Sequence, residues 1–232
     1  MSRKIYIEGA YFKKNPTWHI EDSPWKAKQI INILKKNDVH PKSIVEIGCG
    51  SGEILNQLYL NMPADTTFVG YEISPQAFEL SQKRRKKRLN FYLGDLLQEK
   101  NAFFDVVLCI DVLEHVEDYF SLLRDLKEKG EYKIFHIPLD LSVQTVLRSS
   151  PLLKVWNNLG HIHYFNKEIA IEVLKDTGYK ILDYFYTAGS TDLPAKSFKS
   201  LLARFPRKIM FKLNKDITVR ILGRYSILVL AK

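Results

Sequence analysis

The stretch VEIGCGSGE, residues 45–53, joins a short run rich in β-branched residues to a helical pattern. We expect a strand over 43–47 and a helix from about Glu53. Gly48, Gly50 and Gly52 lie between them. Glycines at such a point let the backbone turn sharply and approach a ligand closely, at a helix N-terminus whose free N–H groups attract anionic groups. The stretch therefore predicts a strand, a ligand-binding turn and a helix.

Strand and helix patterns alternate on both sides of this turn. We expect further strands at 67–71, 90–93, 104–110, 131–137, 179–187 and 225–231, with Pro138 ending the fifth. Helices are predicted from Pro24, from Pro75 with Ser74 as its N-cap, and over 116–129 and 167–176. Residues 139–165 show a less regular pattern. This alternation predicts an α/β fold, with a parallel sheet covered by helices on both faces.

The totals favour one globular domain over residues 1–232. Hydrophobic residues make up 46% of the chain and charged residues 26%. We divide the domain into an N-terminal helix or lid (1–40), a core (43–187), a basic helical insertion (188–223) and a last strand (224–232). There is no signal-peptide pattern and no apolar run of membrane-spanning length, so we expect a cytoplasmic protein. Cys49 and Cys109 lack metal-ligand spacing and are predicted to be buried free thiols.

Acidic residues at the ends of predicted strands sharpen the interpretation of the glycine turn. Glu46 precedes the first glycine, and Glu72 ends the next strand, where an acidic residue accepts hydrogen bonds from ribose hydroxyls in nucleotide-binding sheets. Gly94-Asp95 follows the third strand, and the segments DVVLCIDVLEHV (105–116) and GHIHYF (160–165) follow in order. Together these motifs resemble the class I S-adenosylmethionine-dependent methyltransferases, in the branch that acts on small molecules.

The resemblance covers residues 43–187 and predicts a terminal strand at 225–231. It implies a Rossmann-like sheet of seven strands, mostly parallel, whose last strand is antiparallel. It also implies S-adenosylmethionine as cofactor and S-adenosylhomocysteine as product. Glu46, Gly48 and Gly50 would face the methionine part of the cofactor. Glu72 would bind the ribose, Ile73 would pack on the adenine, and Asp95 and Leu96 would hold the adenine edge. Cys49, Gly52, Asp111 and Val112 complete the implied cofactor-binding residues.

The N-terminal stretch 15–26 is dense in polar and aromatic residues. Two interpretations stand side by side. Trp18 and Trp25 pin the first helix to the sheet, or the segment folds over the cofactor as a lid with His19 or Lys26 reaching its carboxylate.

Methyl transfer from a sulfonium requires alignment and exclusion of water, and an oxygen nucleophile also benefits from a base. His115, His161 and His163 are the candidate catalytic residues, because histidine titrates near neutral pH. The alternative for His115 is a role in capping or orienting the helix that begins near Val116. His161 and His163 would point to one face if the chain is extended there. No third metal ligand is evident beside this pair, so we expect no metal.

The acceptor is predicted to be a small molecule, such as a sugar, a quinone precursor or another metabolite, methylated at O or N. The sequence after the fourth strand lacks the Asn-Pro-Pro-Tyr and Asp-Pro-Pro-Tyr motifs of base-amino methylation. The basic run 83–88 would attract phosphate, but such runs are more often the solvated end of a helix. An RNA methyltransferase is therefore the second hypothesis, and nucleic acid is not the expected partner. A non-catalytic S-adenosylmethionine-binding module is the third.

The net charge of +9 arises entirely from residues 196–232, where ten Lys and Arg face Asp216 alone. Phe198, Leu201, Leu202, Phe205 and Ile209 recur there at helical spacing, among Lys196, Lys199, Arg204, Arg207, Lys208 and Lys212. Pro206 should split this helix in two. Either the apolar stripe is buried against the sheet or over the acceptor pocket, or the basic face over 196–212 contacts a membrane surface or an anionic or lipid-linked acceptor. The oligomeric state is left open.

Overall fold

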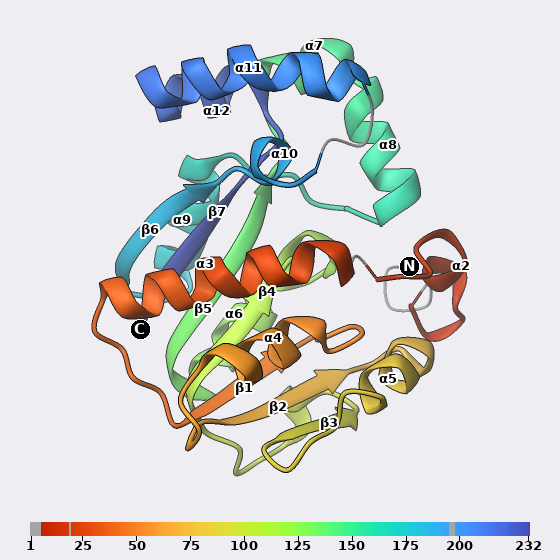
Figure 1. The fold of residues 1–232 in the computed structure, drawn as a ribbon, viewed down its shortest axis with the longest axis vertical. Coiled ribbons are helices and arrows are strands. Elements are labelled where there is room, and N and C mark those ends of the chain that lie inside the picture. Colours follow the sequence, from red (N-terminus) through yellow and green to blue (C-terminus); the bar gives the residue numbers. More distant parts are fainter. Residues whose placement is uncertain (1–5, 19, 195–197) are drawn as a thin grey trace.

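The computed structural model describes residues 6–18, 20–194 and 198–232, and Figure 1 shows them as a central sheet flanked by helices. The seven strands are β1 (Ser43–Ile47), β2 (Thr67–Glu72), β3 (Leu89–Leu93), β4 (Phe104–Ile110), β5 (Gly130–Leu139), β6 (Ile181–Thr187) and β7 (Tyr225–Ala231). Their order across the sheet is β3-β2-β1-β4-β5-β7-β6. Strands β1 to β5 pair in parallel, whereas β7 is antiparallel to both β5 and β6. The predicted fold class is confirmed.

The helices are α2 (Ala10–Lys14), α3 (Ser23–Lys36), α4 (Glu53–Asn61), α5 (Pro75–Gln82), α6 (Tyr119–Lys127), α7 (Val143–Arg148), α8 (Ser150–Leu159), α9 (Lys167–Asp176), α10 (Gly189–Asp192), α11 (Phe198–Leu213) and α12 (Lys215–Leu222). Short 3-10 helices lie at Ile20–Asp22, Leu96–Gln98 and Leu113–His115. Ser74 caps α5 as predicted, since its Oγ accepts a hydrogen bond from the Ala77 N–H and Pro75 follows it.

The core has two halves, one on each face of the sheet, because successive side chains of a strand point to opposite faces. In β4, Val106 and Leu108 pack with Ile30 of α3 and Leu55 of α4. Val107 and Cys109 lie in the opposite cluster, together with residues of α6 and α9. Both faces of β4 are therefore buried, which explains its unbroken apolar run.

The prediction that Pro138 ends the fifth strand is wrong. Strand β5 continues through Pro138, which lies opposite Ser226 of β7. Pairing of β5 with β4 ends at His136, so β7 is the one strand paired with β5 at Pro138. A residue without an N–H group is tolerated where the sheet has such an edge.

Residues 139–165 are more regular than their sequence indicates, because they hold α7 and α8. Ser142 begins α7 with a reciprocal cap, in which its Oγ accepts from the Thr145 N–H and the Ser142 N–H donates to Thr145 Oγ1. Gly160 ends α8 in the left-handed conformation, with φ of 77°. These caps were the available signal, but the helices are too short to show a clear period.

The predicted break at Pro206 is also wrong. Helix α11 runs through Pro206, and the chain breaks instead at Asn214, whose Oδ1 accepts from the Ile217 N–H and caps α12. Pro206 is exposed, so water can satisfy the carbonyl group that loses its helical donor.

The interpretation that buries the apolar stripe of α11 is not supported by the side chains that the structure describes. Leu202, Phe205 and Ile209 are 62%, 73% and 45% exposed. The helix is anchored differently, by Phe211, whose ring stacks on Tyr225 of β7 at 4.9 Å. Residues 19 and 195–197, and the side chains of Phe198, Lys199 and Leu201, lie outside the described part of the chain, so predictions on His19 and Lys196 fall there too. Figure 1 shows α11 and α12 beside α7 at one end of the molecule, beyond the strands.

Candidate active site

A cavity of about 970 Å³ lies where the carboxyl ends of the parallel strands meet. The turn after β1, Glu72 at the end of β2, Asp95 after β3 and Asp111 after β4 all line it. Open α/β sheets bind ligands at this edge, because the loops there diverge on either side of the first strand. The N-terminal segment, through Tyr6, Tyr11, Trp18 and Lys26, forms a further wall.

The glycine turn has the conformation that its composition predicts. Gly52 has φ of 76°, and a Cβ added there would lie 2.4 Å from the Phe91 ring. Gly50 has φ of 54°, and its would-be Cβ points at Trp18, 3.4 Å away. Glycine is therefore required at Gly52 by both backbone and space. Gly48 and Cys49 complete the turn and line the cavity.

Glu72 organises this turn. Its Oε2 accepts from the Gly50 N–H at 2.7 Å, and its Oε1 accepts from the Ser74 N–H at 2.8 Å. Burial raises the pKa of Glu72 above its usual range, although these N–H groups act in the opposite direction. Each carboxylate oxygen has a further lone pair, so Glu72 can still accept a hydrogen bond from a hydroxyl group of a ligand in the cavity.

Glu46 is a buried acid with an unsatisfied oxygen. It is 2% exposed on β1, and its Oε2 has no hydrogen-bond partner among the described residues. Burial raises the pKa of Glu46 well above its usual range, against the positive charge of Lys26. An orphaned acceptor in a cavity wall fits a ligand that brings a donor or a positive charge.

The residues predicted at the adenine edge also line the cavity. Asp95 Oδ1 accepts from the Leu97 N–H at 3.0 Å and so starts the short helix after β3. Leu96 is buried, and Ile73 lies in the wall beside Glu72.

Asp111 is the centre of a charged network that the sequence did not indicate. Its Oδ2 lies 2.7 Å from Lys26 Nζ, and its Oδ1 accepts from His136 Nδ1 at 2.5 Å. His136 Nε2 lies in turn 2.8 Å from Thr187 Oγ1. Burial alone would raise the pKa of Asp111, but the charges of His136 and Lys26 outweigh it and hold that pKa well below its usual value. The sequence indicated Lys26 as a partner for the cofactor carboxylate, but in the structure Lys26 forms an ion pair with Asp111. Val112 follows it in the cavity wall.

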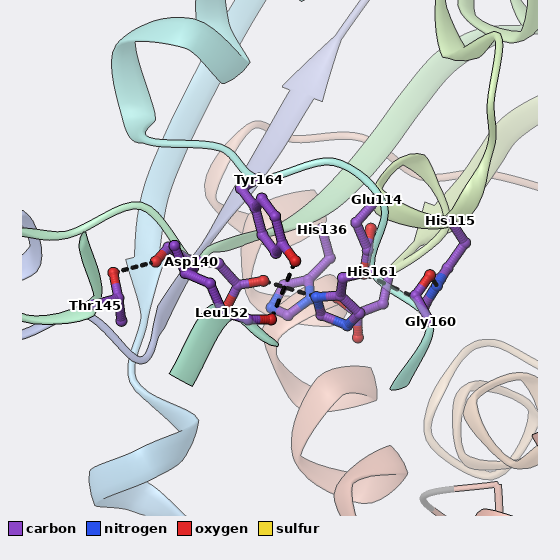
Figure 2. A network of polar contacts seen from close by, with 10 residues as sticks. Glu114, His115, His136, Asp140, Thr145, Leu152, Gly160, His161 and Tyr164 are labelled. Atoms are coloured by element: carbon purple, nitrogen blue, oxygen red, sulfur yellow. Dashed lines mark hydrogen bonds and ion pairs between the residues drawn. The ribbon is translucent and has the colours of Figure 1, made fainter. Parts of the chain in front are cut away.

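Of the three candidate histidines, the structure brings His115 and His161 together, with ring centroids 4.9 Å apart. His115 Nδ1 donates to the Gly160 carbonyl at 3.0 Å, and His161 Nδ1 donates to Asp140 Oδ2 at 2.7 Å (Figure 2). Burial, with a smaller contribution from His161, lowers the pKa of His115 to about 4. His115 is therefore neutral at neutral pH.

Two sequence-based interpretations of the histidines need correction. His163 does not share a face with His161, because its ring packs on Tyr119 at 4.8 Å and it is not among the described residues lining the cavity. His115 does not cap the following helix, since Asp118 does so by accepting from the Ser121 N–H.

Glu114 was missed by the sequence interpretation, although it stands beside His115. It is 1% exposed, and neither of its carboxylate oxygens has a hydrogen-bond partner among the described residues. Burial raises the pKa of Glu114, and the nearby Asp111 adds to this shift. The available signal was that Glu114 and His115, two adjacent polar residues, follow soon after a buried strand.

The N-terminal segment covers this part of the cavity with aromatic rings. Tyr11 lies 4.8 Å from Trp18 and 6.5 Å from His115, measured between ring centroids. Trp25, by contrast, donates from Nε1 to Asp192 Oδ2 at 3.3 Å and so ties α3 to α10. Trp18 therefore fits the lid interpretation. Trp25 also lies against His136 of β5, with ring centroids 6.3 Å apart, and fits the staple interpretation.

The strand order, the glycine turn and the acidic cavity are those of the class I methyltransferase fold. A family model described as "Methyltransferase domain" matches residues 19–184, more than half of the chain. The chain belongs to this family of methyltransferase domains, and the predicted family is confirmed.

Known proteins support the family with limited coverage. The chain is 35% identical over 107 residues to the mitochondrial ubiquinone biosynthesis O-methyltransferase of Schizosaccharomyces pombe, an alignment covering 41% of this chain and 38% of that protein. It is 29% identical over 113 residues to the tRNA U34 carboxymethyltransferase of Campylobacter jejuni, covering 46% and 38%. The chain thus spans well under half the length of these two curated relatives.

Among solved structures, the magnesium protoporphyrin IX methyltransferase of Synechocystis with bound S-adenosylhomocysteine superposes with a TM-score of 0.58 at 18% identity. The match covers 90% of this chain and 82% of that one. This likeness shows the shared fold.

Proposed function

We propose that this protein transfers the methyl group of S-adenosylmethionine to an oxygen or nitrogen atom of a small-molecule acceptor. The observation that carries the proposal is one continuous cavity that joins the glycine turn, with Glu46 and Glu72, to the polar wall formed by Glu114, His115 and His161. S-adenosylmethionine supplies an already activated methyl group on a positively charged sulfur.

The residues of the first wall fit this cofactor. A Cβ at Gly52 would lie 2.4 Å from the Phe91 ring, which leaves no room for a larger side chain at this point of the turn. The unsatisfied Glu46 Oε2 fits the cofactor's ammonium group, and Glu72 fits its ribose hydroxyls. The tyrosine and tryptophan rings over the cavity would exclude water, which favours in-line displacement over hydrolysis.

An oxygen acceptor is favoured by the relation to an O-methyltransferase of ubiquinone biosynthesis. The relation to a tRNA-modifying enzyme keeps RNA as the competing acceptor. Purified protein with labelled S-adenosylmethionine should label small-molecule fractions of a cell extract and leave RNA unlabelled. Label in RNA would replace the small-molecule proposal, and cofactor binding without any transfer would support a binding module.

We further propose that α7, α8, α11 and α12, called here the helical end, rest on an anionic membrane surface. No helix among the described residues is long and apolar enough to cross a membrane. The helical end instead exposes a broad set of large apolar side chains: Val143, Val146, Leu147, Leu153, Trp156, Leu202, Phe205, Ile209, Leu213, Ile217 and Ile221. Exposed apolar surface of this extent marks an interaction site.

The basic residues of the helical end favour an anionic partner. Exposed basic residues lie among these apolar side chains: Arg148, Lys154, Lys208, Lys212 and Lys215. Apolar side chains with a cationic surround complement an anionic lipid leaflet. Leu193, Pro194 and Arg224 join the helical end to the cavity wall, so a lipid-linked acceptor would have a short path inward. Arg207 serves a structural role instead, donating to the Leu222 and Gly223 carbonyls.

Sedimentation with vesicles tests this surface. The protein should bind vesicles that contain phosphatidylglycerol and release as salt is raised, because exposed charges are screened. Lys208→Glu with Lys212→Glu should weaken binding by about 2 kcal/mol or more, at roughly 1 kcal/mol for each basic residue. Lys83→Glu with Lys87→Glu makes the same charge change at exposed sites beside β3 and is the matched control. Equal loss in both pairs, or binding to RNA in place of vesicles, would contradict the proposal.

A further inference from the structure

Glu114, His115 and His161 form a cluster whose ligand atoms all lie within 4.8 Å of one another. Glu114 and His115 come from the short helix after β4, and His161 comes from the loop after α8. All three side chains line the cavity. The cluster therefore lies in the wall of the same cavity as the glycine turn.

The hydrogen bonds of the two histidines decide which nitrogen is free. His115 Nδ1 donates to a backbone carbonyl and His161 Nδ1 donates to the Asp140 carboxylate, both acceptors. In a neutral imidazole the other nitrogen, Nε2, then carries a lone pair. This arrangement, with one nitrogen held by an outer partner and the other left as an acceptor, is the one found in metal-ligating histidines.

Glu114 supplies an independent observation. Its carboxyl group is 1% exposed and has no hydrogen-bond partner at either oxygen among the described residues. His115 Nε2 lies 3.8 Å from Glu114 Oε1, too far for a hydrogen bond. A buried acid without a partner is costly, and a cation between these atoms would remove that cost.

We propose that Glu114, His115 and His161 bind one divalent transition-metal ion whose open positions face the cavity. Two imidazole nitrogens and one carboxylate oxygen favour ions of the Mn²⁺ to Zn²⁺ series over Mg²⁺ and Ca²⁺, which prefer oxygen ligands. Ligands at about 2.0–2.2 Å from one ion lie roughly 3–3.5 Å apart, so the ligand atoms move closer together on binding. Figure 2 shows the three side chains grouped, with Asp140 beside His161 and Gly160 beside His115.

The role of the ion rests on the proposed function. An acceptor hydroxyl that reaches the open positions would have its pKa lowered and lose its proton to solvent. The ionised oxygen then forms a bond to the methyl carbon while the carbon–sulfur bond breaks. The electron pair of the broken carbon–sulfur bond stays on sulfur. This inference departs from the metal-independent enzyme predicted from the sequence.

Metal binding can be tested apart from activity. Tag-free full-length protein, stripped by chelator and dialysed, is titrated with Zn²⁺ by calorimetry and with Co²⁺ by visible spectroscopy. We expect one ion per chain with nitrogen and oxygen ligands, and weaker binding of Mg²⁺. Glu114→Gln and His161→Ala should each weaken binding by more than tenfold, whereas His163→Ala, a neighbouring histidine outside the cluster, should leave metal affinity unchanged.

Asp140→Asn adds a variant that keeps every ligand. It alters the partner of His161 Nδ1 alone and should weaken binding by about 10–100-fold, as outer partners of metal ligands do. No Co²⁺ spectrum from the wild-type protein, or equal losses in His163→Ala and His161→Ala, would overturn the proposal. S-adenosylmethionine affinity is measured in parallel on every variant. Metal binding without cofactor binding would reject the proposed function alone, and cofactor binding without metal binding would reject the metal site alone.

Discussion

The cavity and the helical end depart from the usual distribution of side chains in opposite ways. Around the cavity, the acids Glu46, Glu72 and Glu114 are buried, at 2%, 3% and 1% exposure. At the helical end, Leu147 and Leu213 are 80% and 81% exposed. A buried acid costs free energy unless it is paired, whereas a group of large exposed apolar side chains marks a surface where another molecule binds. The buried acids fit the proposed cofactor, with its ammonium and hydroxyl groups, and the exposed apolar side chains fit the proposed contact with an anionic membrane.

The largest expected effect is on stability, which should fall far more for a substitution in the core than for one at the helical end. Leu55→Ala, on the buried face of α4, should lower the free energy of unfolding by about 2–5 kcal/mol, because a buried cavity remains. Leu147→Ala at the helical end should lower it by less than about 0.5 kcal/mol, because that side chain is exposed. Urea unfolding measures both. A loss above 1 kcal/mol for Leu147→Ala would show that another part of the protein or a second copy covers this end.

The next effect concerns the glycine turn. Gly52→Ala should destabilise the protein by about 2–4 kcal/mol, since it combines a left-handed backbone with a 2.4 Å approach to Phe91. Gly94→Ala is the matched control at the same cavity, because nothing lies within 4 Å of a Cβ there. Thermal and urea unfolding should separate the two variants. Similar losses would mean that the turn relaxes and that the tight packing at Gly52 does not set its conformation.

The smallest of these effects concerns binding rather than folding. Glu72→Ala should weaken S-adenosylmethionine binding by about 1.5–3 kcal/mol, the scale of charge-assisted hydrogen bonds. Glu131→Ala removes an exposed acid paired with Lys232 and serves as the control. Calorimetry with S-adenosylmethionine, S-adenosylhomocysteine and NAD should detect the loss and show no NAD binding. Unchanged affinity in the Glu72 variant would remove this residue from the ribose site.

Local sequence signals were sufficient to predict the fold class and the position of the glycine turn. Alternating strand and helix patterns fix a parallel sheet, and Ser74-Pro75 fixes the start of α5, because these are local signals of period and capping. The resemblance to class I methyltransferases implied that Glu46, Glu72, Asp95 and Asp111 face one cofactor site, and all four line the cavity at the carboxyl ends of the strands.

The polar wall formed by Glu114, His115 and His161 depends on how elements distant in the sequence pack together. His161 follows His115 by 46 positions in the sequence. The path of α7 and α8 brings His161 beside His115 and Glu114, whereas His163 packs on Tyr119. Lys26 likewise reaches Asp111 only because α3 packs on the sheet. Local patterns cannot report such contacts, since they depend on how whole elements pack and on which side chain remains without a hydrogen-bond partner.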